Sequence, residues 1–161
     1  MLDGSIIPIK RIEPYYKIAL KAAKDSPCVR RKYGAVIGYT DTIIIGVNLR
    51  VTKACDNGCI RNRAGVTHGD RSDLGAEVHA EQVALIESQG KGLIFVIAGL
   101  DSDGKELTGV QAYPCLTCAR MIKYAGYRWV HVKEKRSEQL VAVHIEDIIQ
   151  YREEELGPHY E

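Results

Sequence analysis

The chain has 161 residues, the length of one ordinary domain with a substantial hydrophobic core. Its 22 lysines and arginines balance 21 aspartates and glutamates, so it lacks the strongly basic character that is typical of nucleic-acid binding. No apolar run reaches the ~18 residues of a membrane span, and the first residues do not resemble a signal peptide. We therefore expect one domain over residues 1–161, in the cytoplasm, with neither a nucleic-acid polymer nor a membrane as partner.

The first predicted elements follow from proline, helical spacing and β-branched residues. Pro14 suits the first turn of a helix, and apolar spacing carries that helix to about Asp25. Residues 34–39 and 42–48 are rich in β-branched side chains around a polar turn, so they predict a β-hairpin. Residues 49–76 are polar and show no clear period, and a loop of that length in a compact domain is usually functional.

The rest of the chain alternates between helical and extended patterns. Strands are predicted over residues 93–99, 107–113, 129–132 and 139–143, and helices over 79–88, 115–124 and from about 145 onward. Such alternation implies a sheet that is covered by helices. Only six residues separate Val132 from Gln139, whereas parallel neighbours need a crossover of a dozen or more. If these last two strands are neighbours, they must be antiparallel.

Three side chains with metal-binding chemistry open two of the predicted helices. HAE at 79–81 begins one helix, and PCLTC at 114–118 begins the next. Cys115 and Cys118 lie one turn apart on one face, at a helix N-terminus that favours thiolates. Two thiolates and an imidazole suit zinc, and three protein ligands leave the fourth position to water, as in catalytic sites. We predict one catalytic Zn²⁺ bound by His79, Cys115 and Cys118.

Glu81 is the predicted catalytic residue. It lies two residues after His79, where its carboxylate can reach a metal-bound water without binding the metal. It would take a proton from that water, whose pKa zinc lowers from 15.7 toward ~7, and return it to the substrate. The alternative of another class is a binding module with a structural zinc, which would need a fourth protein ligand and no Glu81. A CxxC pair alone is also found in zinc knuckles and redox proteins.

The combination H-x-E with P-C-x-x-C is the recorded signature of zinc-dependent nucleobase deaminases. SPCVRRKYGAVI at 26–37 and the segment at 59–87 resemble deoxycytidylate (dCMP) deaminases, and GVN at 46–48 resembles their sugar-binding segment. The chain is thus similar to the cytidine/deoxycytidylate deaminase superfamily over most of residues 14–130. The resemblance implies a three-layer α-β-α fold of the α/β class, with a mixed five-stranded sheet whose last two strands are antiparallel. It also implies a homo-oligomer.

The two halves of the chain resemble different branches of that superfamily. Residues 93–115 and the segment from Trp129 onward are more similar to free-nucleoside cytidine deaminases, including the antiparallel last strands. Val83 and Tyr113 stand where many members have other residues. We therefore expect a small pyrimidine substrate, with dCMP ahead of cytidine or deoxycytidine. Deamination of another aminated heterocycle, such as a free base, a purine or an antibiotic, remains an alternative.

The resemblance implies that Asn48 binds the sugar. We also predict substrate contacts for Ala80, Arg30 and Tyr113. Cations that could bind a phosphate gather before the first strand and in the long loop: Arg30, Arg31, Lys32, Arg61, Arg63 and Arg71. The long loop also carries the zinc-ligand types Cys55, Cys59 and His68, but with Gly75 in place of a further cysteine a second, structural zinc is the less favoured reading. The charged run at 152–155 predicts a solvated helix face.

Overall fold

The computed structural model describes residues 7–66 and 77–157, whose centre is a mixed five-stranded sheet. The strand order is β2-β1-β5-β6-β7. The strands are β1 (Lys32–Gly38), β2 (Ile43–Val47), β5 (Ile94–Leu100), β6 (Trp129–Lys133) and β7 (Leu140–His144). Strand β1 is antiparallel to β2 and β5, β5 is parallel to β6, and β6 is antiparallel to β7. The predicted hairpin and the predicted antiparallel final pair are both confirmed.

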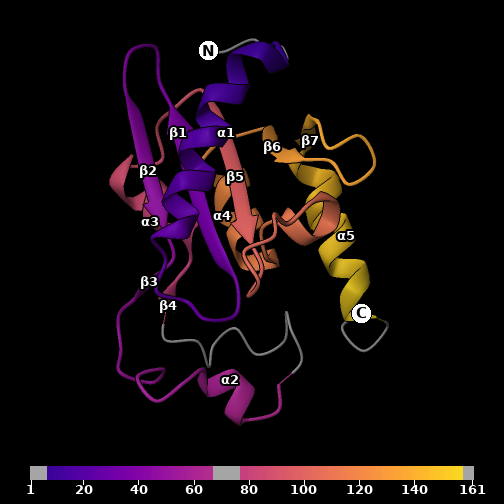
Figure 1. Ribbon diagram of the computed structural model, residues 1–161. Coiled ribbons are helices and arrows are strands. Elements are labelled where there is room, and N and C mark those ends of the chain that lie inside the picture. The colour runs from indigo at the N-terminus through magenta and orange to yellow at the C-terminus, as the bar shows by residue number, and fades with distance from the viewer. Residues whose placement is uncertain (1–6, 67–76, 158–161) are drawn as a thin grey trace.

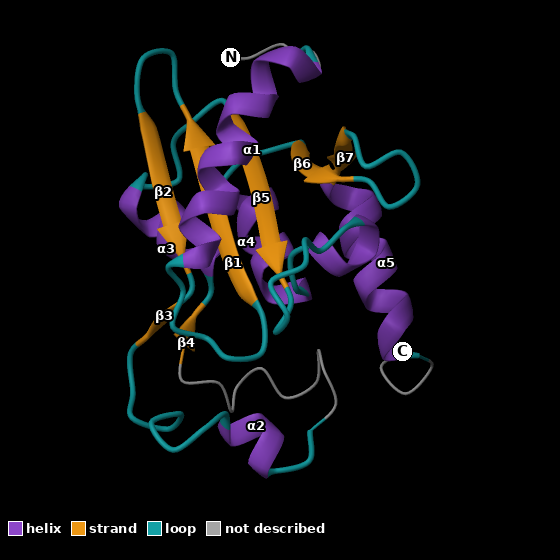
Figure 2. Ribbon diagram, viewed as in Figure 1, coloured by secondary structure: helices purple, strands orange, loops and turns teal. Residues whose placement is uncertain are grey.

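Helices cover both faces of this sheet, which makes the predicted three-layer α-β-α arrangement (Figures 1 and 2). The long helices are α1 (Ile9–Lys24), α3 (Ala80–Glu87), α4 (Leu116–Tyr124) and α5 (Ile145–Leu156). Helix α1 packs on one face, where Ile12 and Ala19 meet Val36 and Val96. Helices α3, α4 and α5 pack on the other face. Each large side chain that is fully buried between these layers contributes about 1.5–3 kcal/mol to stability.

Strand β5 forms the middle of the core and is buried along its whole length. Because successive side chains point to opposite faces, Val96 and Ala98 face α1 while Phe95 and Ile97 face the other helices. A continuous apolar strand of this kind is expected where helices cover both sides of a sheet. The sheet therefore acts as a rigid support for the helix starts that lie on it.

Two features bring the start of α3 against the sheet. A Cβ atom at Gly46 in β2 would overlap the carbonyl oxygen of Ala80 and lie 2.7 Å from the backbone nitrogen of Ala84, so only glycine allows this approach. A separate two-stranded sheet pairs β3 (Leu49–Arg50) with β4 (Glu77–Val78). Because β4 ends immediately before His79, the position of that histidine is fixed from both sides.

Three sequence predictions differ from the structure. The first helix begins at Ile9, upstream of Pro14, because burial of Ile12 against the sheet extends it and a proline is tolerated near a helix start. The sequence predicts a strand over residues 107–113, but Gly109 adopts φ +59° and begins a 3₁₀-helix, Gly109–Ala112. The long loop contains β3 and a short helix α2 (Ile60–Arg63), while residues 67–76 lie outside the described part of the chain.

Among the described residues, no helix combines the length and the apolar character that crossing a membrane would require.

Candidate active site

The three predicted metal ligands meet in space. The Nδ1 atom of His79 lies 3.5 Å from the Sγ atom of Cys115 and 3.5 Å from the Sγ atom of Cys118. All three donor atoms lie within 4.8 Å of one another. Within the described residues, this is the group of histidine, cysteine and acidic side chains whose geometry could hold a metal ion. The sequence spacing therefore identified this cluster correctly.

Local structure holds each of these donors. His79 is the residue before α3, and its backbone N–H donates to the Gln82 side-chain oxygen at 2.9 Å. Cys115 is the N-cap of α4, and its sulfur accepts a hydrogen bond from the backbone N–H of Cys118 at 3.5 Å. A helix N-terminus offers free N–H groups and partial positive charge, which stabilise thiolates at that position.

The distances fit a tetrahedral zinc ion. Zinc binds sulfur at about 2.3 Å and nitrogen at about 2.0 Å, so a tetrahedral angle puts the two donors about 3.5 Å apart. The observed separations between His79 Nδ1 and the two sulfurs are 3.5 Å. Since the set has three protein donors of the types that zinc prefers, it also leaves one position for a non-protein ligand, as in catalytic sites. The residues present therefore fit Zn²⁺.

The electrostatics of the donors favour cation binding. Hydrogen bonding with Cys118 and the neighbouring His79 lower the pKa of the Cys115 thiol to about 4, although burial opposes them. Hydrogen bonding to Cys115 raises the pKa of His79 to about 9 against the effect of burial. The pKa of the Cys118 thiol is raised, because its proton is shared with Cys115 and the group is buried. A divalent cation displaces such protons as it binds, which makes its affinity depend on pH.

Glu81 lies beside this cluster in the first turn of α3 and is only 4% exposed. Burial raises the pKa of its carboxyl group, and the negative charge of Cys115 adds to that effect. His79 and, more weakly, Arg152 act in the opposite direction. A buried carboxyl group with a raised pKa next to a metal site is suited to accept and release a proton.

Two of the residues predicted to bind substrate have well-defined structural roles. Asn48 is 4% exposed, and its side chain accepts from the Tyr33 N–H at 2.8 Å and donates to the Arg31 carbonyl at 3.2 Å. These bonds tie the end of β2 to the start of β1. Ala80 is fully buried, so only its backbone can contact a ligand. The sugar contact of Asn48 and the substrate contact of Ala80 stay predictions.

The other two predicted substrate residues also stay predictions, with different surroundings. Arg30 is partly buried, and its Nη1 atom is fully buried without a hydrogen-bond partner among the described residues. Tyr113 is partly buried and packs edge-on against Tyr151, with ring centroids 5.9 Å apart. A buried guanidinium N–H without a partner costs free energy unless it meets a ligand or water.

Cys55 and Cys59 are buried but do not belong to a metal-binding group among the described residues. The Cys55 sulfur accepts a hydrogen bond from the Ile60 N–H at 3.5 Å. His68 lies outside the described residues, so the second, structural zinc in the long loop stays a less favoured prediction. Arg63, one of the predicted phosphate-binding cations, donates to the carbonyls of Ala54 and Asn57 and thereby holds the loop together. Arg71 also falls outside the described residues.

Sequence reasoning missed Arg152. It predicted that residues 152–155 form a solvated face, but the Arg152 side chain is only 19% exposed and bonds to the backbone that precedes Cys115. No pattern in the sequence marks this, because one arginine within an acidic run looks like an ordinary exposed charge. The prediction holds for Glu153, Glu154 and Glu155, which are exposed.

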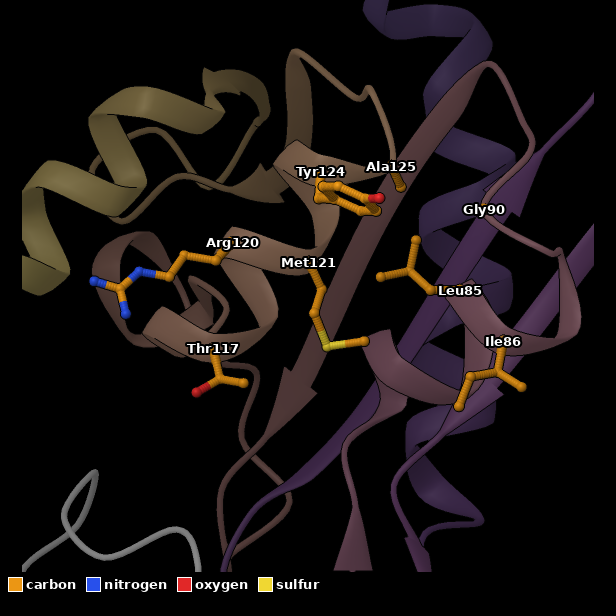
Figure 3. A pocket seen from close by; sticks show the side chains of 8 residues that line it. All are labelled: Leu85, Ile86, Gly90, Thr117, Arg120, Met121, Tyr124 and Ala125. Atoms are coloured by element: carbon orange, nitrogen blue, oxygen red, sulfur yellow. The ribbon is translucent and has the colours of Figure 1, made fainter.

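A groove of about 490 Å³ lies between α3 and α4 (Figure 3). Its lining is mostly apolar: Leu85, Ile86, Gly90, Thr117, Arg120, Met121, Tyr124 and Ala125. None of the metal-binding or catalytic candidates is among these residues. We call this surface the α3–α4 groove.

Known proteins resemble this chain both in its fold and in the segment that contains His79, Glu81, Cys115 and Cys118. The family model described as "Cytidine and deoxycytidylate deaminase zinc-binding region" matches residues 9–134. A search of curated proteins gave no significant match. The matched range includes His79, Glu81, Cys115 and Cys118 and ends at the close of β6.

Solved structures of cytidine deaminases resemble this chain. The enzyme from Burkholderia pseudomallei is 15% identical, with a TM-score of 0.55, covering 84% of this chain and 94% of that one. Those from Mycobacterium tuberculosis (19% identical, TM-score 0.46, 81% and 86% covered) and Mycobacterium leprae (17%, 0.45, 79% and 88%) are less similar in structure. At 15% identity, the likeness to the Burkholderia enzyme concerns the fold alone. The family match over most of the chain, together with the three-donor site, shows that this protein belongs to the cytidine and deoxycytidylate deaminase family of zinc-binding proteins.

Proposed function

We propose that the protein is a zinc-dependent hydrolytic deaminase that converts a cytosine nucleotide, dCMP before others, into its uracil form and ammonia. The observation that carries the proposal is the buried Glu81 carboxyl group beside a three-donor site that leaves one position to a non-protein ligand. A structural zinc site would instead enclose its metal with four protein ligands and would have no use for a buried acid.

The chain's own residues divide the chemistry between them. Zinc bound by His79, Cys115 and Cys118 would supply the Lewis acidity that activates a water molecule at neutral pH. Glu81 accepts one proton from that water and delivers it to the ring nitrogen next to the reacting carbon. The water oxygen adds to carbon 4 of the cytosine ring. Glu81 then takes the second proton and gives it to the departing amine, so that water and cytosine become uracil and ammonia.

The raised pKa of Glu81 supports this shuttle. Two proton acceptances and two donations in one turnover need a group that changes protonation state readily near the working pH. Burial shifts the Glu81 carboxyl group in that direction. The start of α4 contributes N–H groups that stabilise negative charge on the sulfur ligands. Glu81 is therefore the residue to which we assign proton transfer.

Arg30 supports a nucleotide rather than a nucleoside substrate. Its buried Nη1 has no hydrogen-bond partner among the described residues, and a guanidinium binds phosphate through paired N–H groups. We assign Arg30 to the phosphate, Asn48 to the sugar and Tyr113 to the base. Asn48 keeps one free amide proton and one acceptor lone pair for this purpose, beyond its two backbone bonds.

A free nucleoside is the second candidate substrate. The antiparallel pairing of β6 and β7 favours it, because the chain resembles the cytidine deaminase branch in that feature. A nucleoside enzyme has no need of a phosphate-binding arginine, so Arg30 would then be an ordinary partly buried charge. A deaminase of another aminated heterocycle is the third candidate.

We propose that the protein forms a homo-oligomer through the α3–α4 groove. Tyr124 is 96% exposed and Ile86 is 65% exposed, so two large side chains with apolar surface lie uncovered at this groove. Tyr124 borders the groove (Figure 3), so one surface carries both a protruding ring and a hollow. A two-fold axis requires such self-complementarity, because it places the same patch on both subunits. The occupant that we propose is therefore a second copy of this chain.

The five cysteines, all free and all within the described residues, suit a reducing compartment, and we propose the cytoplasm.

One assay tests the proposed function. Zinc-loaded protein is incubated with dCMP, deoxycytidine, cytidine, cytosine and adenine derivatives, and ammonia is measured. Release from a cytosine compound supports the proposal, with dCMP expected to be the best substrate. Release from adenine derivatives alone would move the protein to a different substrate class, and no release from any compound would favour the binding module.

A further inference from the structure

One side chain of α5 forms hydrogen bonds with the backbone that immediately precedes Cys115. The Nε atom of Arg152 donates to the Pro114 carbonyl at 3.0 Å, and its Nη2 atom donates to the Tyr113 carbonyl at 2.8 Å. Nη2 also donates to the Val110 carbonyl at 3.1 Å. Pro114 immediately precedes Cys115. One guanidinium group therefore fixes three carbonyls within the segment 110–114.

The contact uses the shape of the guanidinium group. Nε–H and Nη2–H lie on one edge of a rigid plane, and they reach two carbonyls that are adjacent in the chain. The third nitrogen, Nη1, bonds to the Glu155 carboxylate at 2.8 Å, which orients the plane from the solvent side. A lysine ammonium would offer one nitrogen on a flexible stem and could not hold the same set.

The neighbouring residue of α5 reinforces the same contact. The ring of Tyr151 packs edge-on against that of Tyr113 at an interplanar angle of 86°. The guanidinium carbon of Arg152 lies 5.6 Å from the centre of the Tyr151 ring. The segment is thus held by its backbone through Arg152 and by a side chain through Tyr151. Without Arg152, three of the hydrogen bonds that hold the backbone of this segment would be lost.

We propose that Arg152 is a positioning residue for the metal centre. It fixes the segment 110–114 so that the Cys115 sulfur stays 3.5 Å from the His79 nitrogen, the separation of two ligands of one tetrahedral zinc ion. The inference rests on the proposed function in that it takes His79, Cys115 and Cys118 as the zinc ligands. Groups that orient metal ligands from outside typically change metal affinity by about 10–100-fold when they are removed. The role that we assign is geometric and does not require Arg152 to touch the substrate.

The test compares Arg152→Gln and Arg152→Lys with Lys123→Gln. Lys123 is the matched control, because its Nζ also joins α4 to α5, through Glu146 at 2.7 Å, but it is exposed, its partner lies outside the segment 110–114, and it does not line the α3–α4 groove. Zinc affinity is measured by competition with a chromophoric chelator. The absorption spectrum of the cobalt-substituted protein reports the thiolate-to-metal bands and the tetrahedral geometry.

We expect Arg152→Gln to weaken zinc binding at least tenfold and to alter the cobalt spectrum. The zinc affinity of Arg152→Lys should lie between those of Arg152→Gln and wild type, and that of Lys123→Gln should stay within twofold of wild type. Wild-type affinity and an unchanged spectrum in Arg152→Gln would overturn the inference. If that variant does not fold, Arg152→Lys decides, and wild-type affinity there would equally overturn it. If the wild-type protein binds zinc but has no deaminase activity, the proposed function is refuted and this inference is not. If the wild-type protein is active and the Arg152 variants keep its zinc affinity and cobalt spectrum, this inference is refuted and the proposed function is not.

Discussion

The Nδ1 atom of His79 and the Sγ atom of Cys115 lie 3.5 Å apart although 36 positions separate them in the chain. Each residue directly precedes a helix, α3 or α4, and β5 runs between the two helices in sequence. The sheet therefore brings two helix N-termini together at one point. Because the donors sit at helix starts, their positions depend on how closely each helix packs, and this dependence underlies the predictions below.

Removing a sulfur ligand should remove the metal. Cys115→Ser or Cys118→Ser is expected to reduce zinc from about one ion per chain to well below half, because three-ligand sites tolerate no loss of a thiolate. Metal analysis after dialysis measures this. Cys55→Ser and Cys59→Ser are the controls and should keep wild-type zinc. A lower zinc content in these controls would instead indicate a second metal site in the long loop.

The close approach of α3 to β2 should matter for the metal as well as for stability. Gly46→Ala would push a methyl group into the backbone of Ala80 and Ala84, and we expect a loss of about 1–3 kcal/mol in the free energy of unfolding together with weaker zinc binding. Gly34→Ala is the matched control, because its Cβ would meet the backbone of α1 at Ala19 on the opposite face. It should lower the melting temperature and leave zinc affinity unchanged. Equal zinc affinity in both variants would show that α3 does not position His79.

Much of this architecture could be predicted from the sequence, and the reasons are local. The His79, Cys115 and Cys118 cluster follows from ligand types at helix starts, and the antiparallel β6–β7 pair follows from a connection too short for a crossover. The hairpin of β1 and β2 follows from β-branched runs around a turn. The two strand pairings depend on neighbours in the chain, and the metal cluster on a signature of residue types and spacing that a single sequence displays.

The features that were missed depend on distant contacts. The sequence predicts a solvated charge at Arg152 because its three carbonyl partners lie 38 to 42 positions away in the chain. Residues 107–113 look extended, but Gly109 adopts a positive φ, and Gly109–Ala112 form a 3₁₀-helix. Ile12 extends the first helix past Pro14 because the sheet buries it. At Arg152 and Ile12, tertiary packing overrides a local preference.

The substrate assignment makes a prediction for Arg30. The wild-type enzyme should prefer dCMP over deoxycytidine by at least tenfold in kcat/KM, since ~1.4 kcal/mol from a phosphate contact already gives that factor. Arg30→Gln should remove most of this preference by lowering kcat/KM for dCMP while leaving deoxycytidine within about threefold. Steady-state kinetics with both substrates provide the comparison. An equal or reversed preference in the wild type would assign the enzyme to free nucleosides.

The oligomer proposal is tested at Tyr124. A glutamate at this 96% exposed position would place a charge inside a two-fold interface, so Tyr124→Glu should shift the protein from oligomer to monomer in light scattering at micromolar concentration. Leu156→Glu, at a 42% exposed apolar position outside the groove, should leave the mass unchanged. A monomeric wild type would contradict self-association. An oligomer that persists in Tyr124→Glu would mean that the copies meet through another surface and that the groove serves a different partner.

The central claim is that Glu81 transfers protons for a zinc-dependent deamination, and one measurement addresses it most directly. Wild type and Glu81→Gln are loaded to the same zinc content, confirmed by metal analysis, and ammonia release from dCMP and deoxycytidine is followed under identical conditions. Glutamine keeps the shape of the side chain but cannot accept a proton. We predict that kcat falls by about 10²–10⁴-fold or more, because the same group serves several transfers, while zinc content and melting temperature stay near those of the wild type. A Glu81→Gln protein that binds zinc and releases ammonia at the wild-type rate would contradict the account.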